Sequence, residues 1–419
     1  MVNIVEEDKN IQQQMEDLFQ FIFKNVDQSK ISNKNKQKIK EEIHGLQSFV
    51  VGARPARIAI VGRRGAGKSS LINAIFGEPK AAVGDYASQT GTGSWYLFEN
   101  TLGGLDILDT RGLGEAHRPQ EETLAKEPLE EVKLSIANKC PDVILFLCKG
   151  KEVGGRLDED LSQLLELTQE IKSLHNYDVP VMGVVTQVDE LAPLSNSEPP
   201  FEHSAKQENI EATVSILREK INEVITKPIH VIPISAYMEF SEDDTIVYDK
   251  RWNIDVLLHY LLLELPEEAQ VILAKLSKIK SVQKNLARTI RKSVMTVTGL
   301  VGATPVPIAD LPVITGLQIS MIGTIAMISG KKLSRKTIVE FVGAMGVNVG
   351  VGVALRSISR QLVKVFPGAG SVISGAIASA GTYALSEAAI AYFIDHKSKE
   401  EAKHIFEQEM KAQRKKSKE

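Results

Sequence analysis

One stretch of the chain has the residue types and spacing suited to binding phosphate. The apolar run Ile58-Ala59-Ile60-Val61 leads into G-x-x-x-x-G-K-S, which starts at Gly62 and is followed by apolar residues at helical spacing. A strand, a glycine-rich loop and a helix are the context in which this pattern forms a phosphate site. The four fixed positions alone would occur by chance in such a chain about once in a hundred. We predict that the loop residues that bind a nucleotide are Gly62, Gly65, Ala66, Gly67, Lys68, Ser69 and Ser70.

Each residue type in this loop has a physical role. Glycine lets the backbone bend around an anion, so that N–H groups and a helix N-terminus face the phosphates. Lys68 should reach the β and γ phosphates, and the Ser69 hydroxyl should ligate Mg²⁺. Arg64 lies beside the expected γ-phosphate. It could stabilise charge there as an arginine supplied in cis, or it could face solvent, and the sequence favours neither.

Two further segments suit the metal and the γ-phosphate. An apolar run at 105–108 ends in D-x-x-G, where Asp109 would hold Mg²⁺ through water and the Gly112 N–H would contact the γ-phosphate. Upstream, the run Gln89-Thr90-Gly91-Thr92-Gly93 offers hydroxyls for the metal. Thr90 is our first choice and Thr92 the reserve. The alternative is a polar turn before a strand.

Two later strand ends suit recognition of a base. The apolar run before Thr186-Gln187-Val188-Asp189 ends in a carboxylate, which can accept both N–H donors of guanine. Adenine has no such donor pair, so Asp189 would select the base. The strand ending at Ser235-Ala236 would bring the Ala236 N–H to the guanine carbonyl oxygen.

The order and spacing of these motifs resemble those of the Ras-like GTPases. The form Gly67-Lys68-Ser69-Ser70-Leu71-Ile72-Asn73-Ala74 looks like the translation-factor-related branch, which includes Era-like, dynamin-like and immunity-related GTPases. The resemblance implies GTP as substrate, GDP as product, Mg²⁺ as cofactor, and catalytic roles for Arg64, Lys68, Thr90 and Gly112. A Pro-Val-Pro-Ile-Ala-Asp-Leu run and a Phe-Pro-Gly-Ala-Gly stretch near the C-terminus resemble a domain of unknown function that follows such GTPase domains in bacterial proteins.

The chain departs from the family's pattern at two positions. Gln187 stands where the guanine motif usually has a lysine that stacks over the loop, which would weaken guanine binding. Leu113 stands where Ras-like enzymes carry a water-orienting glutamine, so intrinsic hydrolysis should be slow unless another group positions the water. Glu115 and His117 are weaker candidates for that task.

The elements that must position these residues alternate between strands and helices. Apolar or half-apolar runs at 57–61, 94–98, 105–108, 142–148, 179–185 and 230–234 alternate with helical patterns at 119–139, 158–176 and 203–226. This predicts an α/β fold with a mostly parallel sheet covered on both faces. We divide the chain into N-terminal helices (1–53), a GTPase domain (54–265), a basic amphipathic linker helix (266–292), an apolar Gly/Ala-rich helical domain (293–395) and a charged tail (396–419) that is either a solvated helix or disordered.

The C-terminal half leaves two alternatives open. Residues 270–292 carry seven Lys or Arg and no acid, which suits either an anionic membrane surface or a connecting helix with a solvated basic face. The apolar segments beyond them suit either a compact helical domain, joined by the N-terminal helices, or a membrane-inserted hairpin, although Pro305 and Pro307 should break a helix there.

Composition sets the remaining limits. With 50 Lys plus Arg against 53 Asp plus Glu, bulk charge favours no nucleic-acid partner. Cys140 and Cys148 form no metal or disulfide pattern, and the acidic N-terminus shows no secretory leader, so we expect a cytoplasmic protein, associated with a membrane in one alternative.

These observations predict a GTP-hydrolysing switch or self-assembling GTPase that forms a homodimer through its GTPase domain. A nucleotide-binding membrane scaffold with negligible turnover is the first alternative. An ATPase is the second, and it is disfavoured because the strand before Asp109 ends in D-T-R-G rather than in paired acids.

Overall fold

The computed structural model describes two compact units. The described residues are 2–29, 31–63, 65–80, 95–100, 102–109, 128–155, 157–302, 311–331, 334–345 and 375–416. One unit spans Pro55–Pro266, and the other combines Met1–Arg54 with Glu267–Glu419. The chain therefore passes from one unit to the other twice, at Arg54–Pro55 and at Pro266–Glu267.

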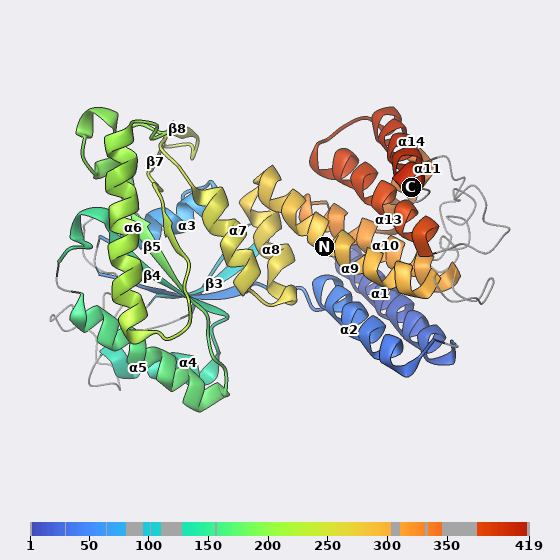
Figure 1. Ribbon diagram of the computed structural model, residues 1–419, viewed down its shortest axis with the longest axis horizontal. Helices are drawn as coiled ribbons and strands as arrows, with labels where there is room; N and C mark the ends of the chain where they lie inside the picture. Colours follow the sequence, from blue (N-terminus) through green and yellow to red (C-terminus); the bar gives the residue numbers. More distant parts are fainter. Residues whose placement is uncertain are drawn as a thin grey trace. The chain divides into compact units, whose positions relative to one another are not determined.

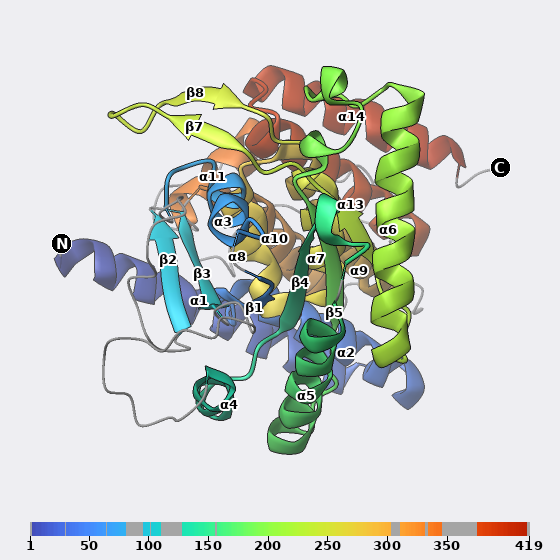
Figure 2. The same ribbon diagram turned by 90° about the vertical axis from the view of Figure 1, so that its left-hand side faces the viewer.

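The first unit contains a six-stranded sheet in the order β2-β3-β1-β4-β5-β6 (Figure 2). All neighbouring strands are parallel except β2 and β3, which are antiparallel. The strands are β1 (Ala56–Val61), β2 (Trp95–Asn100), β3 (Gly103–Asp109), β4 (Val143–Lys149), β5 (Val181–Thr186) and β6 (Val231–Pro233). The predicted α/β class with a mostly parallel sheet is confirmed.

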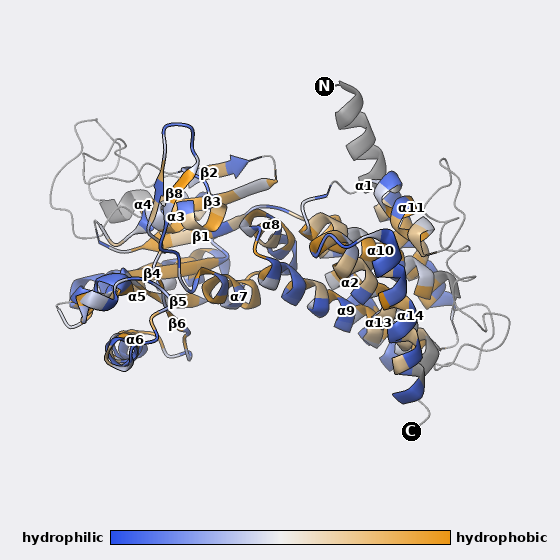
Figure 3. Ribbon diagram, turned by 90° about the horizontal axis from the view of Figure 1, so that it is seen from above, coloured by the Kyte–Doolittle hydropathy of each residue, from blue (hydrophilic) through white to orange (hydrophobic). Residues whose placement is uncertain are grey.

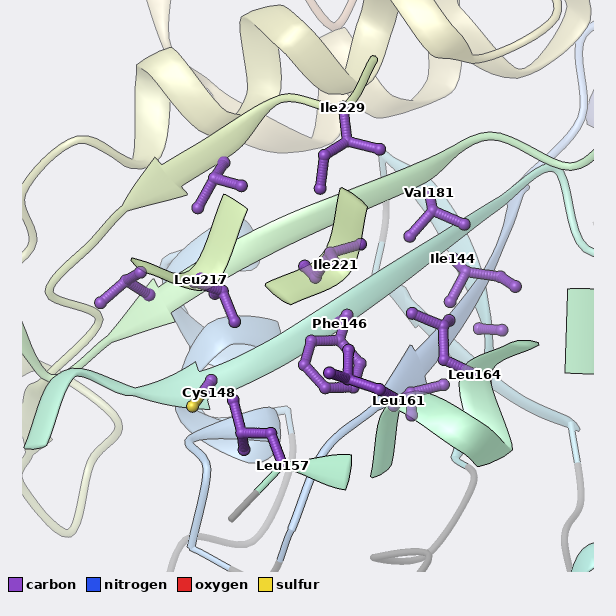
Figure 4. Packing of buried hydrophobic residues seen from close by; sticks show 14 of the residues in the cluster. Ile144, Phe146, Cys148, Leu157, Leu161, Leu164, Val181, Leu217, Ile221 and Ile229 are labelled. Carbon is purple, nitrogen blue, oxygen red and sulfur yellow. The ribbon is translucent and has the colours of Figure 1, made fainter. Parts of the chain in front are cut away.

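Helices α4, α5 and α6 cover one face of this sheet. Phe146 of β4 points towards Leu161 and Leu164 of α5, and Leu217 and Ile221 of α6 lie over β4 and β5 (Figure 4). The alternate residues of β1, β4 and β5 are buried as well, so both faces of these strands are covered, and β4 and β5 appear largely hydrophobic (Figure 3). The helices of this unit are α3 (Lys68–Phe76), α4 (Pro128–Asn138), α5 (Asp158–His175), α6 (Ser204–Val224) and α7 (Ile254–Glu264).

A two-stranded hairpin follows the last strand of the sheet and was not foreseen. It is formed by β7 (Met238–Phe240) and β8 (Ile246–Asp249), and all four residues of β8 are exposed. Each of these strands is only three or four residues long, which is too short for the periodicity by which a strand is found in a sequence. The hairpin extends away from the sheet in Figure 2.

The second unit is entirely helical in its described part and joins both ends of the chain. Its helices are α1 (Val2–Gln28), α2 (Asn33–Val50), α8 (Glu267–Ser277), α9 (Lys280–Gly302), α10 (Leu311–Ile328), α11 (Arg335–Ala344), α13 (Gly375–Ala389), with a π-helical segment Ile390–Ile394, and α14 (Lys399–Lys416). Helix α9 packs against α10, α13 and α2 (Figure 1). Helix α1 approaches α10 so closely that a Cβ on Gly316 would lie 3.0 Å from Ile22 Cδ1. The predicted helical domain built from both ends of the chain is confirmed.

The basic segment 270–292 is not one helix. Helix α8 ends at Ser277, and Lys278 takes a left-handed conformation (φ 55°) before α9 begins at Lys280. The apolar face of α9, including Leu286, Ile290 and Val294, is buried inside the helical unit. The apolar surface that a lipid would contact is thus occupied by neighbouring helices.

The charged tail forms a helix with a clear start signal. The Ser398 hydroxyl accepts from the Glu401 N–H (3.1 Å), and the Glu401 carboxylate accepts from the Ser398 N–H (2.8 Å). This is a capping box. Helix α14 then buries Ala402, Phe406 and Met410, while the rest of its surface is largely hydrophilic (Figure 3). Among the described residues, no helix combines the length and the apolar character needed to span a bilayer.

Candidate nucleotide-binding site

The loop between β1 and α3 has the backbone shape that its glycines predict. Gly65 (φ 73°) and Gly67 (φ 88°) lie in the left-handed region, which a side chain disfavours. At Gly62 the obstacle is space, because a Cβ would lie 2.6 Å from the Leu147 carbonyl oxygen. Gly67 is also the N-cap of α3, so the free N–H groups of that helix begin at the loop.

Lys68 and the two serines open helix α3. The Lys68 ammonium donates to the Gly62 carbonyl (2.8 Å) and so spans the loop from its last residue to its first. Ser69 and Ser70 lie half-buried in the first helical turn. This first turn therefore brings one ammonium and two hydroxyls to the loop.

The end of β5 is hydrogen-bonded to the same loop. The buried Thr186 hydroxyl donates to the Ala66 carbonyl (2.9 Å), and the Gln187 side-chain amide donates to the Gly65 carbonyl (2.9 Å). Gln187 itself is left-handed (φ 56°). The neutral amide thus binds the loop directly, and only the positive charge of the family's lysine is missing at this position.

Asp189 follows in a short 3₁₀ helix, Val188–Glu190, where its side chain is half-buried. The Val188 N–H donates to the Ile234 carbonyl (3.3 Å), so the two base-reading segments predicted from sequence are adjacent. Beyond Ile234, Ser235 exchanges backbone hydrogen bonds with Trp252, and Ala236 is buried. The Ser235 hydroxyl is buried without a partner among the described residues.

Lys206, which the sequence did not single out, fixes the segment that carries Asp189. Its side chain is fully buried, and its ammonium donates to the carbonyl oxygens of Asp189 (2.8 Å) and Leu191 (2.6 Å). The same ammonium lies 5.1 Å from the centre of the Phe201 ring. Burial lowers the pKa of Lys206, and the Asp189 charge acts in the opposite direction. A lysine on the buried stripe of α6, one turn before Ile210, was the signal that could have revealed it.

A second unforeseen contact holds the loop from helix α5. Arg63 Nε lies 2.7 Å from Asp160 Oδ2, and the Asp160 side chain is only 5% exposed. Burial raises the pKa of Asp160 despite the opposing effect of the Arg63 charge. Burial also raises the pKa of the nearby Cys148 thiol to about 12, so this cysteine stays protonated and unreactive at neutral pH.

The structure does not describe several of the site residues predicted from the sequence. Arg64, Thr90, Thr92, Gly112, Leu113, Glu115 and His117 lie outside the described residues, and Asp109 is described only as the last residue of β3. Its backbone is in register with Ile60 of β1, two residues before Gly62. The structure thus brings together the loop, Thr186, Gln187 and the segment of Asp189, and places the end of β3 next to the strand that leads into the loop.

Comparison with known families agrees with this architecture. Residues 57–186 match a family model described as 50S ribosome-binding GTPase. Residues 57–186 thus have the fold and the sequence pattern of a P-loop GTPase domain. Later in the sequence, residues 268–418 match a second model, described as Domain of unknown function (DUF697).

Curated relatives match part of the chain. GTPase Der of Pseudomonas syringae pv. tomato is 32% identical over 108 residues, which are 26% of this chain and 21% of that protein. GTPase Der of Aquifex aeolicus is 33% identical over 137 residues (32% and 28%), and tRNA modification GTPase MnmE of Campylobacter jejuni subsp. doylei is 30% identical over 135 residues (31% and 28%). The chain thus spans between 21% and 28% of these relatives' length.

Solved structures resemble the chain at low scores. Era in complex with MgGDPNP and nucleotides 1506-1542 of 16S ribosomal RNA is 22% identical and covers 58% of this chain and 68% of its own, with a TM-score of 0.35. Toc33 from Arabidopsis thaliana in complex with GDP and Mg2+ is 18% identical and covers 60% and 96%, also with a TM-score of 0.35. Scores this low place no individual residue of the GTPase domain.

Proposed function

We propose that this protein binds GTP and GDP with Mg²⁺ and hydrolyses GTP. One observation carries the proposal: Thr186 and Gln187 donate hydrogen bonds to the carbonyls of Ala66 and Gly65. These bonds connect the segment that would read the base to the loop that would bind the phosphates. Lys206 and the bond from Val188 to Ile234 hold Asp189 in that segment. A nucleotide on the loop would then have Asp189, Ser235 and Ala236 available for its base.

The chemistry of the residues at the loop supports Mg²⁺ as the metal. Ser69 lies in the first turn of α3, and Asp109 ends the strand next to β1. A hydroxyl and a carboxylate are hard oxygen ligands, and Mg²⁺ prefers such ligands together with substrate phosphates. Thr90 would complete this set. Bound Mg²⁺ would neutralise charge on the phosphates.

The residues of the chain would divide the work as follows. The loop N–H groups and Lys68 would bind the β and γ phosphates, and Ser70, in the first turn of α3, would also contact the nucleotide. Arg64 would stabilise the negative charge that develops as phosphate leaves. Thr90 and the Gly112 N–H would contact the γ-phosphate end and would be released after hydrolysis, which makes the domain a switch. Leu113 supports a slow intrinsic rate, since its side chain cannot orient water.

Asp189→Asn tests the base selector. Because asparagine presents only one acceptor and no charge to the two guanine donors, GDP affinity should fall roughly 10- to 100-fold. Affinity for xanthosine diphosphate should rise, because xanthine carries a carbonyl where guanine carries its amino group. Titration of the purified protein with labelled nucleotides measures both.

Glu190→Gln is the matched control, since Glu190 is adjacent, exposed and ion-paired with Lys151. Its affinities should stay within about twofold of the wild type. Unchanged GDP affinity in Asp189→Asn, or ATP outcompeting GTP on the wild type, would reject the guanine site.

We also propose two properties at the level of the whole chain. Self-association of the GTPase domain would supply the water-orienting group that is missing at Leu113. Membrane association would depend on charge alone, since Lys278, Lys280, Arg288 and Lys292 are exposed while the apolar face of α9 is buried. A nucleotide-dependent scaffold without turnover remains the alternative function, favoured by Leu113 and Gln187.

A further inference from the structure

The strand order places one more residue at the loop. In the sheet, β1 has β3 on one side and β4 on the other, and the chain order of the strands reverses at this point. In open parallel sheets, ligands bind in the crevice at the carboxyl ends of the two strands that flank such a reversal. One of those ends is the glycine-rich loop after β1. The other is Lys149, the last residue of β4.

Lys149 packs directly against the loop. A Cβ built on Gly65 would lie 3.0 Å from Lys149 Nζ and 3.3 Å from its Cε. The lysine therefore occupies the space that a side chain at residue 65 would need. Lys149 is in register with Thr186 on β5, the residue before Gln187. Gly65 thus has the Lys149 ammonium beside its Cα, and the Gln187 amide donates to its carbonyl.

The charge of Lys149 is only partly neutralised. Its side chain is 25% exposed, and its ammonium lies 3.2 Å from Glu152 Oε1. Glu152 is 43% exposed, so water screens this pair. An ammonium has three N–H donors, and a single screened carboxylate leaves it free to interact with a second anion.

We infer that Lys149 is a nucleotide-binding residue whose ammonium provides, from β4, positive charge for the phosphates on the loop. The inference rests on the proposed function and extends it, because Gln187 supplies the hydrogen bond to the loop but no charge. Gln187 would thus supply the hydrogen bond and Lys149 the positive charge, which a single lysine at position 187 could supply together.

Three variants test this inference by binding of GDP and of inorganic pyrophosphate at low and high salt. Lys149→Gln removes the charge and keeps an amide of similar length, so both affinities should fall about tenfold at low salt. The loss should shrink at high salt, because screening weakens the lost attraction. Lys149→Arg keeps the charge and should bind within about threefold of the wild type.

Lys151→Gln is the control variant. Lys151 is two residues away, 55% exposed and ion-paired with Glu190. Its loss should change either affinity by less than about twofold. Thermal unfolding of each variant shows whether it is folded.

Each outcome decides the matter. Equal affinity of Lys149→Gln and wild type overturns the inference, as does an equal loss in Lys149→Gln and Lys149→Arg, which would indicate shape rather than charge. If the wild type binds pyrophosphate but not GDP, and Lys149→Gln lowers the affinity for pyrophosphate, the guanine proposal fails and the inference stands. If the wild type binds neither probe, both fail.

Discussion

The ion pair of Arg63 and Asp160 lowers the stability of the folded protein at neutral pH while it holds the phosphate loop. Asp160 is almost fully buried, and burial raises its pKa even though Arg63 Nε lies 2.7 Å away. Because the pKa is raised, the folded state favours the protonated carboxyl. That stabilising preference is fully present below the unfolded pKa and is lost as the pH rises through the folded pKa. At neutral pH the ionised Asp160 therefore costs stability, while it anchors a residue of the phosphate loop.

Asp160→Asn should separate these two effects. The neutral side chain avoids the cost of burying a charge, so the unfolding midpoint should rise by roughly 1 to 3 °C at pH 7.5. The gain should shrink as the pH falls, because the raised pKa lets the wild-type carboxyl take up its proton. GDP affinity should fall a few-fold, because Arg63 loses its ionic anchor. Calorimetry across pH, with exposed Asp158→Asn as the control, measures this. A less stable variant at pH 7.5 would mean that the ion pair outweighs the burial cost.

At the scale of elements, helix α6 both covers the sheet and holds the base-reading segment. Ile210, Leu217 and Ile221 pack into the core, and Lys206 continues the same buried stripe towards the segment after β5. There its ammonium satisfies two carbonyl oxygens, which would otherwise have to be met by water. The position of Asp189 therefore depends on the packing of a helix that begins 15 residues later.

Lys206→Met should loosen this segment without touching the phosphate loop. GDP affinity should fall about fivefold to tenfold as two charge-assisted hydrogen bonds are lost. General destabilisation would weaken all nucleotides alike, so the informative quantity is the ratio of GDP to inosine diphosphate affinity, because inosine lacks the amino group that Asp189 would bind. We expect this ratio to fall towards one. Lys220→Met, which removes a lysine on the same helix that donates to Gly155, should leave the ratio unchanged.

The elements also show which features a sequence can disclose. The phosphate loop is local, and its glycines require the same backbone in any context, so it was predicted residue by residue. Strands buried on both faces, such as β4, were found by their continuous apolar runs. Exposed β8 was missed because its apolar run, Ile246-Val247-Tyr248, is only three residues long, and the break at Lys278 because a left-handed lysine leaves no local signal. Lys149 and Asp160 reach the loop, and Lys206 reaches the segment after β5, through strand pairing and helix packing, which a single sequence does not show.

The whole molecule joins the GTPase domain to the helical unit through two peptide connections, Arg54–Pro55 and Pro266–Glu267. Helix α8 and the segment before β1 meet inside the helical unit, where the Arg54 N–H donates to the Glu268 carbonyl (2.8 Å). Arg54 and Glu268 also form an ion pair (3.3 Å). Both connections therefore start from one hydrogen-bonded point in the helical unit.

The last prediction concerns turnover by the intact chain. If self-association supplies the missing water-orienting group, GTP hydrolysis per molecule should rise with protein concentration, by about tenfold or more across the range in which dimers form. Vesicles rich in anionic lipid should shift this rise to lower concentration at low salt, because the exposed lysines and arginines of the α8–α9 region would gather the protein on the surface, and high salt should abolish the shift. A measurable rate that does not change with concentration would mean that catalysis is complete within one chain, and Arg64 would be the first residue to replace.

Turnover equal to the protein-free control at every concentration would reject the enzyme in favour of a scaffold, because a folded P-loop domain that binds GTP without cleaving it can act only through its bound state. No response to vesicles, in a protein whose turnover does rise with concentration, would remove the membrane from the proposal and leave self-association as the means by which the domain completes its site.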